Sequence, residues 1–375
     1  MEGRTKDSMT VAEHLRPMRG VSLVDTYKGV IRKKTLFFFG LLVILCAITI
    51  YAIAAGTYDL SPLKVIRALL GCEEGPAGIV IWNIRMPRIV AAIVAGWGLA
   101  ISGVGVQCLL KNPLGSPFTL GISHGAAFGA ALAIVVLGAG ATQTSVLRTT
   151  ASALVFLEDL FSVTFFAFLG AMAATLVILA LSKLKNLSAG SIILAGVALS
   201  SLFVSGTILI QYFATEVEIA TIVFWTFGDV SRSSWQEIGL MTIASVVVTV
   251  YFVLNRWNLN ALSSGEDVAK GIGVEVERIR LWGMLMAALV AALVTAFHGV
   301  IAFLGLLAPH IARRMVGADH RFLIPYACIV GALLLLLADT VGRILIGSGT
   351  LPVGVLTSFM GAPLFLYLLV RGYGK

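Results

Sequence analysis

Uncharged stretches recur along the whole chain and are separated by short segments that carry the Lys, Arg, Asp and Glu residues. An α-helix rises about 1.5 Å per residue, so about 20 apolar residues are needed to cross the hydrocarbon layer of a membrane. Most of the stretches are this long, and each of them predicts one transmembrane helix. The stretches are 35–58, 89–110, 112–147, 160–182, 186–215, 238–255, 281–312, 322–338 and 344–370.

Two of these stretches do not fit a single straight crossing. The stretch 281–312 contains break signals at His298-Gly299 and at Ala308-Pro309, which predict one full helix followed by a short, broken one. The stretch 112–147 opens with NPLGSP, which delays its helix to about Phe118. Because broken helices at membrane depth are tolerated where they line a cavity, this pattern favours a transporter over a passive anchor.

The composition supports the same class of protein. Hydrophobic residues make up 58% of the 375 positions and charged residues 12%, about half the charged share of an ordinary globular domain. We therefore expect an all-α integral membrane protein with about ten transmembrane helices, some of them short or broken. The predicted division is a tail over 1–34 and a transmembrane domain over 35–375, which includes a polar loop at 259–280.

The distribution of Lys and Arg predicts the orientation of these helices. If the N-terminus is inside, 20 of the 27 Lys and Arg residues fall in inner segments. The positive-inside rule then places both termini in the cytoplasm of a plasma (inner) membrane protein. The net charge of +8 lies mainly in these inner loops, so it reports orientation and does not predict nucleic-acid binding.

The N-terminal segment allows two interpretations. The sequence IRKK, followed by an apolar run and AIAAG, is compatible with a secretory signal and its cleavage site. However, the run from Thr35 to Tyr58 is longer than the apolar core of a signal peptide, and the charged segment before it is also long. An uncleaved first helix preceded by a cytoplasmic tail is therefore favoured.

The usual motifs of catalytic and nucleotide-binding sites are absent from the sequence, which contains no GxxxxGK[ST], HExxH or GxSxG. Its four cysteines are scattered and predict neither a disulfide nor a metal site. The ionisable residues near predicted helix ends are His298, His310 and Asp339, and the histidines are best explained by hydrogen bonds to freed backbone. Because no carboxylate has a convincing position in mid-membrane, we expect transport energy to come from another subunit.

The segment LNALSSGEDVAKGIGVEVERIR, residues 259–280, is the most polar internal stretch. Its pattern predicts a short cytoplasmic helix that Ser264 caps, with Glu266 and Asp267 in the first turn and Gly271 or Gly273 at its end. A solvated linker is the simpler interpretation. Since a linker needs far fewer residues, a lever for a motor protein is the alternative that the length favours.

Several motifs resemble the permease subunits of the ATP-binding cassette importers for iron-siderophore, haem and cobalamin, the FecCD-type family. They are GEDVAKGIGV (265–274), GVIAFLGLLAPHIARRMVGADHR (299–321), GALLLLLADTVGR (331–343) and LPVGVLTSFMGAPLFLYLLVR (351–371). The stretch 84–130, with IRMPR and KNPLGSP, and LAGVAL (194–199) are similar to the same family. The resemblance covers roughly residues 40–372.

The resemblance implies a ten-helix fold like that of the cobalamin importer permease, which works as a homodimer in the lipid membrane. Two cytoplasmic P-loop ATPase subunits would bind below it, and one extracytoplasmic substrate-binding protein would dock above. The chain itself would then have no catalytic residue, metal or cofactor, because ATP and Mg²⁺ belong to the ATPase. In GISHGAAFG, the glycines at 121, 125 and 129 are also predicted to give the third helix a smooth packing face.

The resemblance further implies three groups of functional residues. ATPase coupling is assigned to Gly265, Glu266, Asp267 and Gly271. A cytoplasmic gate is assigned to Asn112 and Leu114 and to Ser188, Ala189 and Gly190, although the second loop is smaller than the family pattern. Docking of the binding protein is assigned to Arg85, Arg88 and Arg343, for which headgroup contacts are the alternative. The favoured substrate is a ferric siderophore, then cobalamin, then haem, and an ion-coupled secondary transporter is the alternative function.

Overall fold

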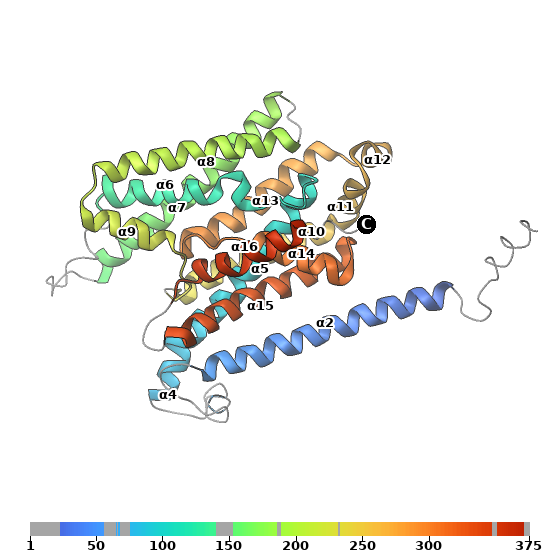
Figure 1. Ribbon diagram of the computed structural model, residues 1–375, viewed down its shortest axis with the longest axis horizontal. Helices are drawn as coiled ribbons and strands as arrows, with labels where there is room; N and C mark the ends of the chain where they lie inside the picture. The colour runs from blue at the N-terminus through green and yellow to red at the C-terminus, as the bar shows by residue number, and fades with distance from the viewer. Residues whose placement is uncertain are drawn as a thin grey trace, which may run out of the picture. The chain divides into compact units, whose positions relative to one another are not determined.

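The computed structural model describes residues 23–55, 65, 67, 76–139, 153–185, 189–231, 233–346 and 351–370. The chain divides into two compact units, Met1–Val43 and Ile44–Lys375, and the boundary falls inside the first described helix. All regular structure in the described residues is helical (Figure 1). The all-α fold predicted from the uncharged stretches is confirmed.

Each of the ten predicted segments forms a helix in the described part of the chain. Seven helices are long and apolar enough to cross a membrane, while α6, α14 and α16 are shorter. The long helices are α2 (Leu23–Ala54), α5 (Met86–Leu109), α7 (Ala153–Lys185), α8 (Ala189–Tyr212), α10 (Trp235–Leu254), α13 (Val276–His298) and α15 (His320–Ile346). The shorter ones are α6 (Ile122–Val136), α14 (Leu304–Val316) and α16 (Val353–Val370).

The ends of several helices differ from the prediction. Helix α2 already includes residues 23–34, which were expected to belong to the tail. Helix α13 ends at His298, as predicted, but α14 continues through Pro309, so the predicted break there is wrong. Pro309 lies in the second turn of α14, where few carbonyl groups precede it and the ring disturbs little of the helix.

One short helix was not expected. Helix α9 (Glu216–Thr226) follows α8 directly, and its N-terminus is a capping box. The carboxylate of Glu218 accepts the backbone N–H of Thr215 at 2.8 Å, and the Thr215 hydroxyl accepts the N–H of Glu218 at 3.4 Å. The T-x-x-E spacing is a sequence signal for this start, which the focus on long apolar stretches missed.

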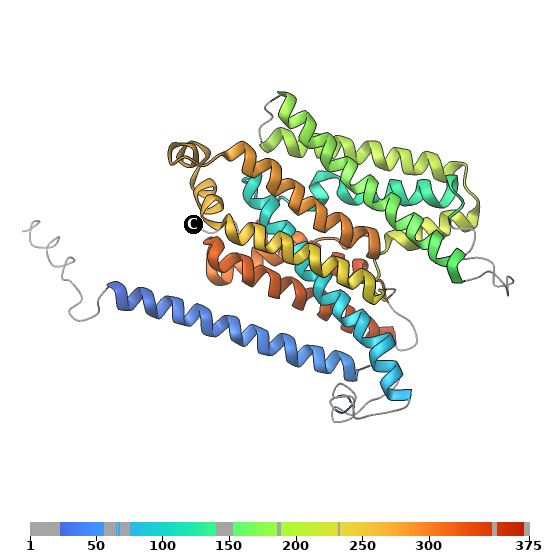
Figure 2. The same ribbon diagram turned by 180° about the vertical axis from the view of Figure 1, so that it is seen from behind.

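Helix α5 forms the centre of the larger unit and lies between α15 and α13 (Figures 1 and 2). Its apolar window is 83% buried, against 11% for the window of α8, so α8 faces outward along most of its length. A Cβ on Gly96 of α5 or on Gly331 of α15 would collide with the carbonyl oxygen of the other glycine. These two glycines therefore let the central helices touch backbone to backbone.

The predicted smooth face of α6 is partly confirmed. Gly125 and Gly129 pack against the backbone of α7, where a Cβ would collide with the carbonyl oxygens of Gly170 and Phe166. Gly121 lies before the helix, with φ +73°, and approaches α8 instead. The 3₁₀ turn Pro117–Leu120 precedes it, so α6 starts four residues later than expected.

Helix α5 begins at Met86, with Pro87 in its first turn, but other helical segments precede it. The helical backbone starts with α4 (Pro76–Ile79) and passes through a π-helical segment, Val80–Arg85, into α5. In this segment the backbone N–H of Met86 donates to the carbonyl of Ile81, five residues back. The wider turn brings Arg85 and Arg88 to the end of the bundle where α15 finishes.

Candidate functional site

Two of the three arginines predicted to dock a partner bind one carboxylate, that of Asp339. Nε of Arg88 donates to Oδ1 of Asp339 at 2.7 Å, and a terminal nitrogen of the same guanidinium lies 2.7 Å from this oxygen as an ion pair. Nε of Arg343 lies 3.2 Å from Oδ2 of the same side chain, one turn along α15. Asp339 is fully buried, so both guanidinium groups hold it away from water.

Arg85 and Arg343 also bind the end of α2. Arg85 donates to the carbonyl oxygens of Ile53 and of Ala54, the latter at 3.0 Å. Arg343 donates to the carbonyl of Ala52 at 3.1 Å. The last carbonyls of a helix have no partner within the helix and carry partial negative charge, so cations stabilise them.

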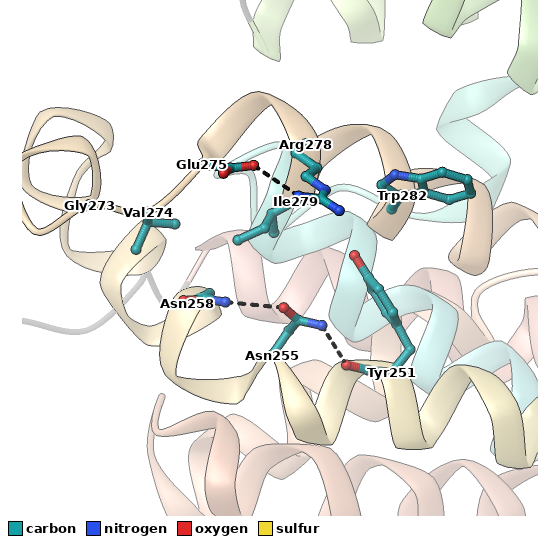
Figure 3. A pocket seen from close by; sticks show the side chains of 9 residues that line it. All are labelled: Tyr251, Asn255, Asn258, Gly273, Val274, Glu275, Arg278, Ile279 and Trp282. Atoms are coloured by element: carbon teal, nitrogen blue, oxygen red, sulfur yellow. Dashed lines mark hydrogen bonds and ion pairs between the residues drawn. The ribbon is translucent and has the colours of Figure 1, made fainter.

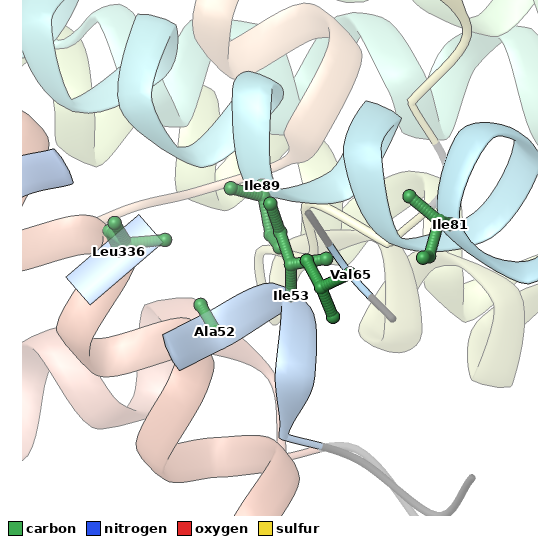
Figure 4. Close-up of a cluster of buried hydrophobic side chains, with 6 residues drawn as sticks. All are labelled: Ala52, Ile53, Val65, Ile81, Ile89 and Leu336. Atoms are coloured by element: carbon green, nitrogen blue, oxygen red, sulfur yellow. The ribbon is translucent and has the colours of Figure 1, made fainter. Parts of the chain in front are cut away.

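An apolar layer lies at the same end of the bundle as the arginine cluster, which we define as Arg85, Arg88, Asp339 and Arg343. Figure 4 shows the side chains of this layer, which come from α2, the π-helical segment, α5 and α15 and from Val65. They are Ala52, Ile53, Val65, Ile81, Ile89 and Leu336. Removing one member of such a buried, charge-paired group leaves an uncompensated charge in an apolar surrounding, which is strongly destabilising.

Sequence reasoning assigned the arginines a role in docking but missed that Asp339 holds them. The residue was considered only as a possible coupling carboxylate. Its spacing of four from Arg343 was the available signal, because residues four apart on a helix are neighbours. Arg85 and Arg88 are 6% and 8% exposed, so only their edges reach the surface here. Docking of a partner stays a prediction.

The polar loop lies at the opposite end of α5 and forms two helices. Helix α11 spans Arg256–Ser264, and α12 spans Glu266–Gly271. Gly265 joins them with φ +142°, a conformation that side-chain-bearing residues rarely adopt. The predicted cap at Ser264 is wrong, since this residue ends α11 and its hydroxyl donates to the Asn260 carbonyl at 3.3 Å. The predicted acidic first turn and the end at Gly271 are confirmed.

Glu266 is the centre of a second charge cluster. Its carboxylate lies 3.0 Å from Arg280, 3.3 Å from Lys270 and 3.7 Å from Lys111. Partial burial alone would raise the pKa of Glu266, but the positive charges of Arg280 and Lys270 outweigh it and lower that pKa below its usual value. Asp267, the next residue, is exposed.

Apolar side chains on the same two helices are exposed. Val268 and Ile272, four residues apart along α12 and its C-cap, are 53% and 68% exposed, and Trp257 of α11 is 61% exposed. Beside them, a cavity of about 520 Å³ opens between the end of α10, α11 and the start of α13 (Figure 3). In Figure 3, Arg278 reaches Glu275 on one side of this cavity and Tyr251 faces it from α10. Exposed apolar residues around a hollow are typical of a docking surface.

The first predicted gate loop is a tight turn after α5. Lys111 has φ +47°, and the Asn112 side chain accepts the backbone N–H of Leu114 at 2.9 Å. Asn112 therefore shapes the turn that presents Leu114. In the second loop, Ser188 lies outside the described residues, while Ala189 and Gly190 begin α8.

The two histidines near helix ends are buried. His298 is the last residue of α13, and its carbonyl accepts the backbone N–H of Asp229 at 2.7 Å. His310 lies inside α14. A mostly apolar cavity of about 460 Å³ lies near His298. It is bounded by the end of α9, the α13–α14 link and α16, and its wall includes Phe227, Val300 and Phe359.

The fold and these two ends define a class of protein. Seven long apolar helices make it a multi-pass membrane protein, and short helices and cavities between them are typical of a permease. The chain belongs to the FecCD transport family, whose model matches residues 42–371. It is the membrane permease of an ATP-binding cassette importer.

Individual relatives agree with this assignment. The chain is 49% identical to the "Putative ABC transporter permease protein MJ0087" of Methanocaldococcus jannaschii, over 95% of this chain and 100% of the relative. It is 34% identical to the hemin transport system permease protein HmuU of Yersinia pestis, over 88% and 95%. A solved metal-chelate type ABC transporter in an inward-facing conformation matches with a TM-score of 0.76 and 30% identity, over 90% of this chain and 100% of the other.

Proposed function

We propose that the protein passes a metal chelate from a substrate-binding protein into the cytoplasm as one half of a homodimer. The observation that carries the proposal is the placement of two different surfaces at opposite ends of α5. The arginine cluster lies at one end, and the exposed helices α11 and α12 lie at the other. A transporter driven by a separate motor needs one surface for each partner.

The coupling surface fits a cytoplasmic ATPase subunit. Helix α12 offers Asp267, Val268 and Ile272 to a partner, while Glu266 is held inward by cations of its own chain. Gly265 and Gly271 set the bend and the end of this helix. A short rigid helix with exposed apolar side chains transmits motion better than a flexible loop. ATP and Mg²⁺ are bound by the ATPase, and this chain acts only as the transport subunit.

The docking surface fits acidic side chains on an extracytoplasmic binding protein. Arg88 and Arg343 share one carboxylate, so an incoming carboxylate meets a local excess of positive charge. Arg85 lies one helical turn before Arg88 and extends the same surface. This end is then extracytoplasmic, both termini are cytoplasmic, and the gate residues Asn112, Leu114, Ser188, Ala189 and Gly190 close the inner side.

The second copy of the chain fits along α8. Leu194, Leu202 and Leu209 of this helix are 71%, 66% and 62% exposed. In a homodimer, α8 would face its counterpart or lipid, and the translocation route would run beside it.

A ferric siderophore is the proposed substrate. Relatives are named for hemin and for vitamin B12, which are also large chelates of a single metal ion. Of the chelate class, siderophores are the favoured member, with cobalamin as the alternative.

An ion-coupled carrier is the competing function, and the structure argues against it. Asp339 is the buried carboxylate near a span end that such a carrier would use, but Arg88 and Arg343 hold it as an ion pair.

Reconstitution tests the proposed function directly. Liposomes with the permease, its genomically neighbouring ATPase and the binding protein should accumulate radioactive ferric siderophore only when ATP is enclosed. The permease alone should hydrolyse no ATP. Uptake by the permease alone under a proton or sodium gradient would refute the proposal.

Docking is tested by charge reversal. Changing both Arg85 and Arg343 to Glu should weaken binding of the substrate-binding protein at least about tenfold at low salt, and the loss should shrink as salt screens the contact. Because both arginines also hold α2, the variant must first show wild-type elution and melting. Arg314→Glu, an exposed arginine at the other end of the bundle, is the control. Equal affinities at every ionic strength would contradict docking.

A further inference from the structure

A second polar cavity lies at the coupling end of the bundle, and its lining is basic. Its volume is about 320 Å³, and the end of α5, the gate turn, α11 and the α14–α15 junction surround it. Lys111, Arg313 and His320 contribute to its wall, together with Gln107 and Ser263. We propose that this cavity, the basic pocket, binds a phosphate group or a similar tetrahedral oxyanion.

His320 provides the first argument, because its ring is oriented with one nitrogen unsatisfied. Its Nδ1 lies 2.8 Å from the side-chain oxygen of Asn260, and the same oxygen accepts the His320 backbone N–H at 2.9 Å. That oxygen is therefore an acceptor, and Nδ1 is the donor. Nε2 is left in the wall of the pocket without a hydrogen-bond partner, although His320 is only 2% exposed. A buried polar atom without a partner calls for a ligand or a water molecule.

The charges around the pocket provide the second argument. Arg313 is oriented by the side-chain oxygen of Gln107, 3.3 Å away, and Gln107 is in turn fixed by the Leu306 carbonyl. The nearby acids have closer partners: Glu266 lies 3.0 Å from Arg280 and 3.3 Å from Lys270, and Asp319 accepts the Asn260 amide at 2.9 Å. Lys111 lies 3.7 Å from Glu266, the longest of its contacts, and lines the cavity together with Arg313, so the wall carries positive charge, which favours an anionic ligand.

The chemistry of these side chains narrows the anion to an oxyanion. A guanidinium presents several N–H donors in a plane, which fits two oxygens of a phosphate group, and a lysine adds a point charge. Because Nδ1 donates to Asn260, Nε2 of the neutral ring is an acceptor, and it can take the hydrogen of a protonated phosphate oxygen. A chloride ion has no hydrogen to donate to Nε2 of His320. The phosphate can come from solution or from a lipid headgroup, since both have the same chemistry.

The location gives the pocket a regulatory meaning, which rests on the proposed function. Pro113 of the gate turn and Ser263 of α11 line the same cavity. An anion bound between Lys111 and Arg313 would tie the gate turn to the coupling helices and relieve the repulsion between the two cations. Binding itself does not depend on transport, so the two proposals can fail separately.

Calorimetric titration of sodium phosphate into the purified full-length permease in detergent, at constant ionic strength, tests binding. We expect saturable binding that Arg313→Gln weakens at least about tenfold, as expected for a lost hydrogen bond to a charged group. Lys111→Asn should weaken it similarly, and asparagine suits the positive φ at this position. Arg313→Lys should retain part of the affinity. Arg314→Gln, which changes the exposed neighbouring arginine, should leave it unchanged.

Native mass spectrometry of protein purified from membranes distinguishes the two sources of phosphate. A phospholipid that wild type and Arg314→Gln retain and Arg313→Gln loses would identify a lipid headgroup. Binding of free phosphate without such a lipid would identify a soluble anion. Absence of both in the wild-type protein, or equal binding in all variants, would overturn the proposal.

Discussion

The two charge clusters of the protein share a composition and differ in burial. In the arginine cluster, Asp339 is fully buried and is held by Arg88 and Arg343. In the Glu266 cluster, the carboxylate is 30% exposed and lies near Lys111, Lys270 and Arg280. One carboxylate and several cations thus occur twice, once in an apolar surrounding and once at the solvated end.

Burial decides what these similar groups do for the protein. Water screens the exposed cluster, so each of its ion pairs contributes little to stability and can exchange partners easily. In the buried cluster, loss of one member leaves a charge with neither an ion-pair partner nor water, which lowers the stability strongly. The arginine cluster therefore fixes the end of α2 to α5 and α15, whereas the Glu266 cluster orients a loop that has to respond to a partner.

The largest effect is expected from Asp339→Asn. This change keeps the shape of the side chain but leaves two guanidinium groups without their carboxylate, so it should destabilise the protein by about 3 kcal/mol or more. Thermal unfolding in detergent, followed by size-exclusion chromatography, measures the loss. If this variant melted at the wild-type temperature, the buried cluster would contribute no more to stability than the exposed one.

A smaller effect is expected when the apolar layer is opened. Leu336→Ala removes a fully buried side chain beside the arginine cluster and should cost about 2 kcal/mol or more. Leu337→Ala makes the same change one residue further along α15, at a position 36% exposed, and is the matched control. Equal melting temperatures for both variants would mean that the layer does not support the cluster.

Glu266→Gln should change the stability much less than Asp339→Asn does. It removes a carboxylate from solvated ion pairs, for which a loss of about 0–1 kcal/mol is expected. Its effect should appear in ATPase affinity, because Arg280 and Lys111 lose the group that orients them. Glu277→Gln is the control, since Glu277 also pairs with Arg280 but is 75% exposed. A melting loss as large as that of Asp339→Asn would contradict the comparison.

The smallest effect is a dependence on pH. The pKa of Glu266 is lowered in the folded protein, so its contribution is present above its usual pKa of 4.5 and is lost as the pH falls through the lower folded value. Melting curves of wild type and Glu266→Gln, measured from neutral to acid pH, should therefore converge below pH 4.5. Curves that stay parallel throughout would mean that the carboxylate contributes nothing to folding.

Apolar stretches were sufficient to predict the long helices. A helix that crosses lipid needs a long segment with few charges, whichever helices it packs against. The same reasoning could not predict the π-helical segment at Val80–Arg85 or the continuation of α14 through Pro309. Both depend on tertiary packing, which decides whether a local break signal ends a helix. Short elements such as α9 have a signal only in their caps.

The predicted sites differ in how far sequence could define them. Arg343 is far from Arg85 and Arg88 in sequence, and it was grouped with them because of the resemblance to a family, not because of spacing. Lys270 lies four residues from Glu266 and was visible as a partner, whereas Arg280 and Lys111 reach it only through the fold. Asp339 was noticed as an ionisable group, but its meaning depends on contact with Arg88, 251 residues away.

The π-helical turn before α5 also makes the chain tolerant of a one-residue deletion. A π turn holds one residue more than an α turn, so a deletion between Val80 and Arg85 can be absorbed as an ordinary α-helix. Because the turn itself takes up the lost residue, the helix before it would keep its orientation relative to Arg88. Relatives without this turn should align with a one-residue gap here and present the same face of α5 to the end of α2.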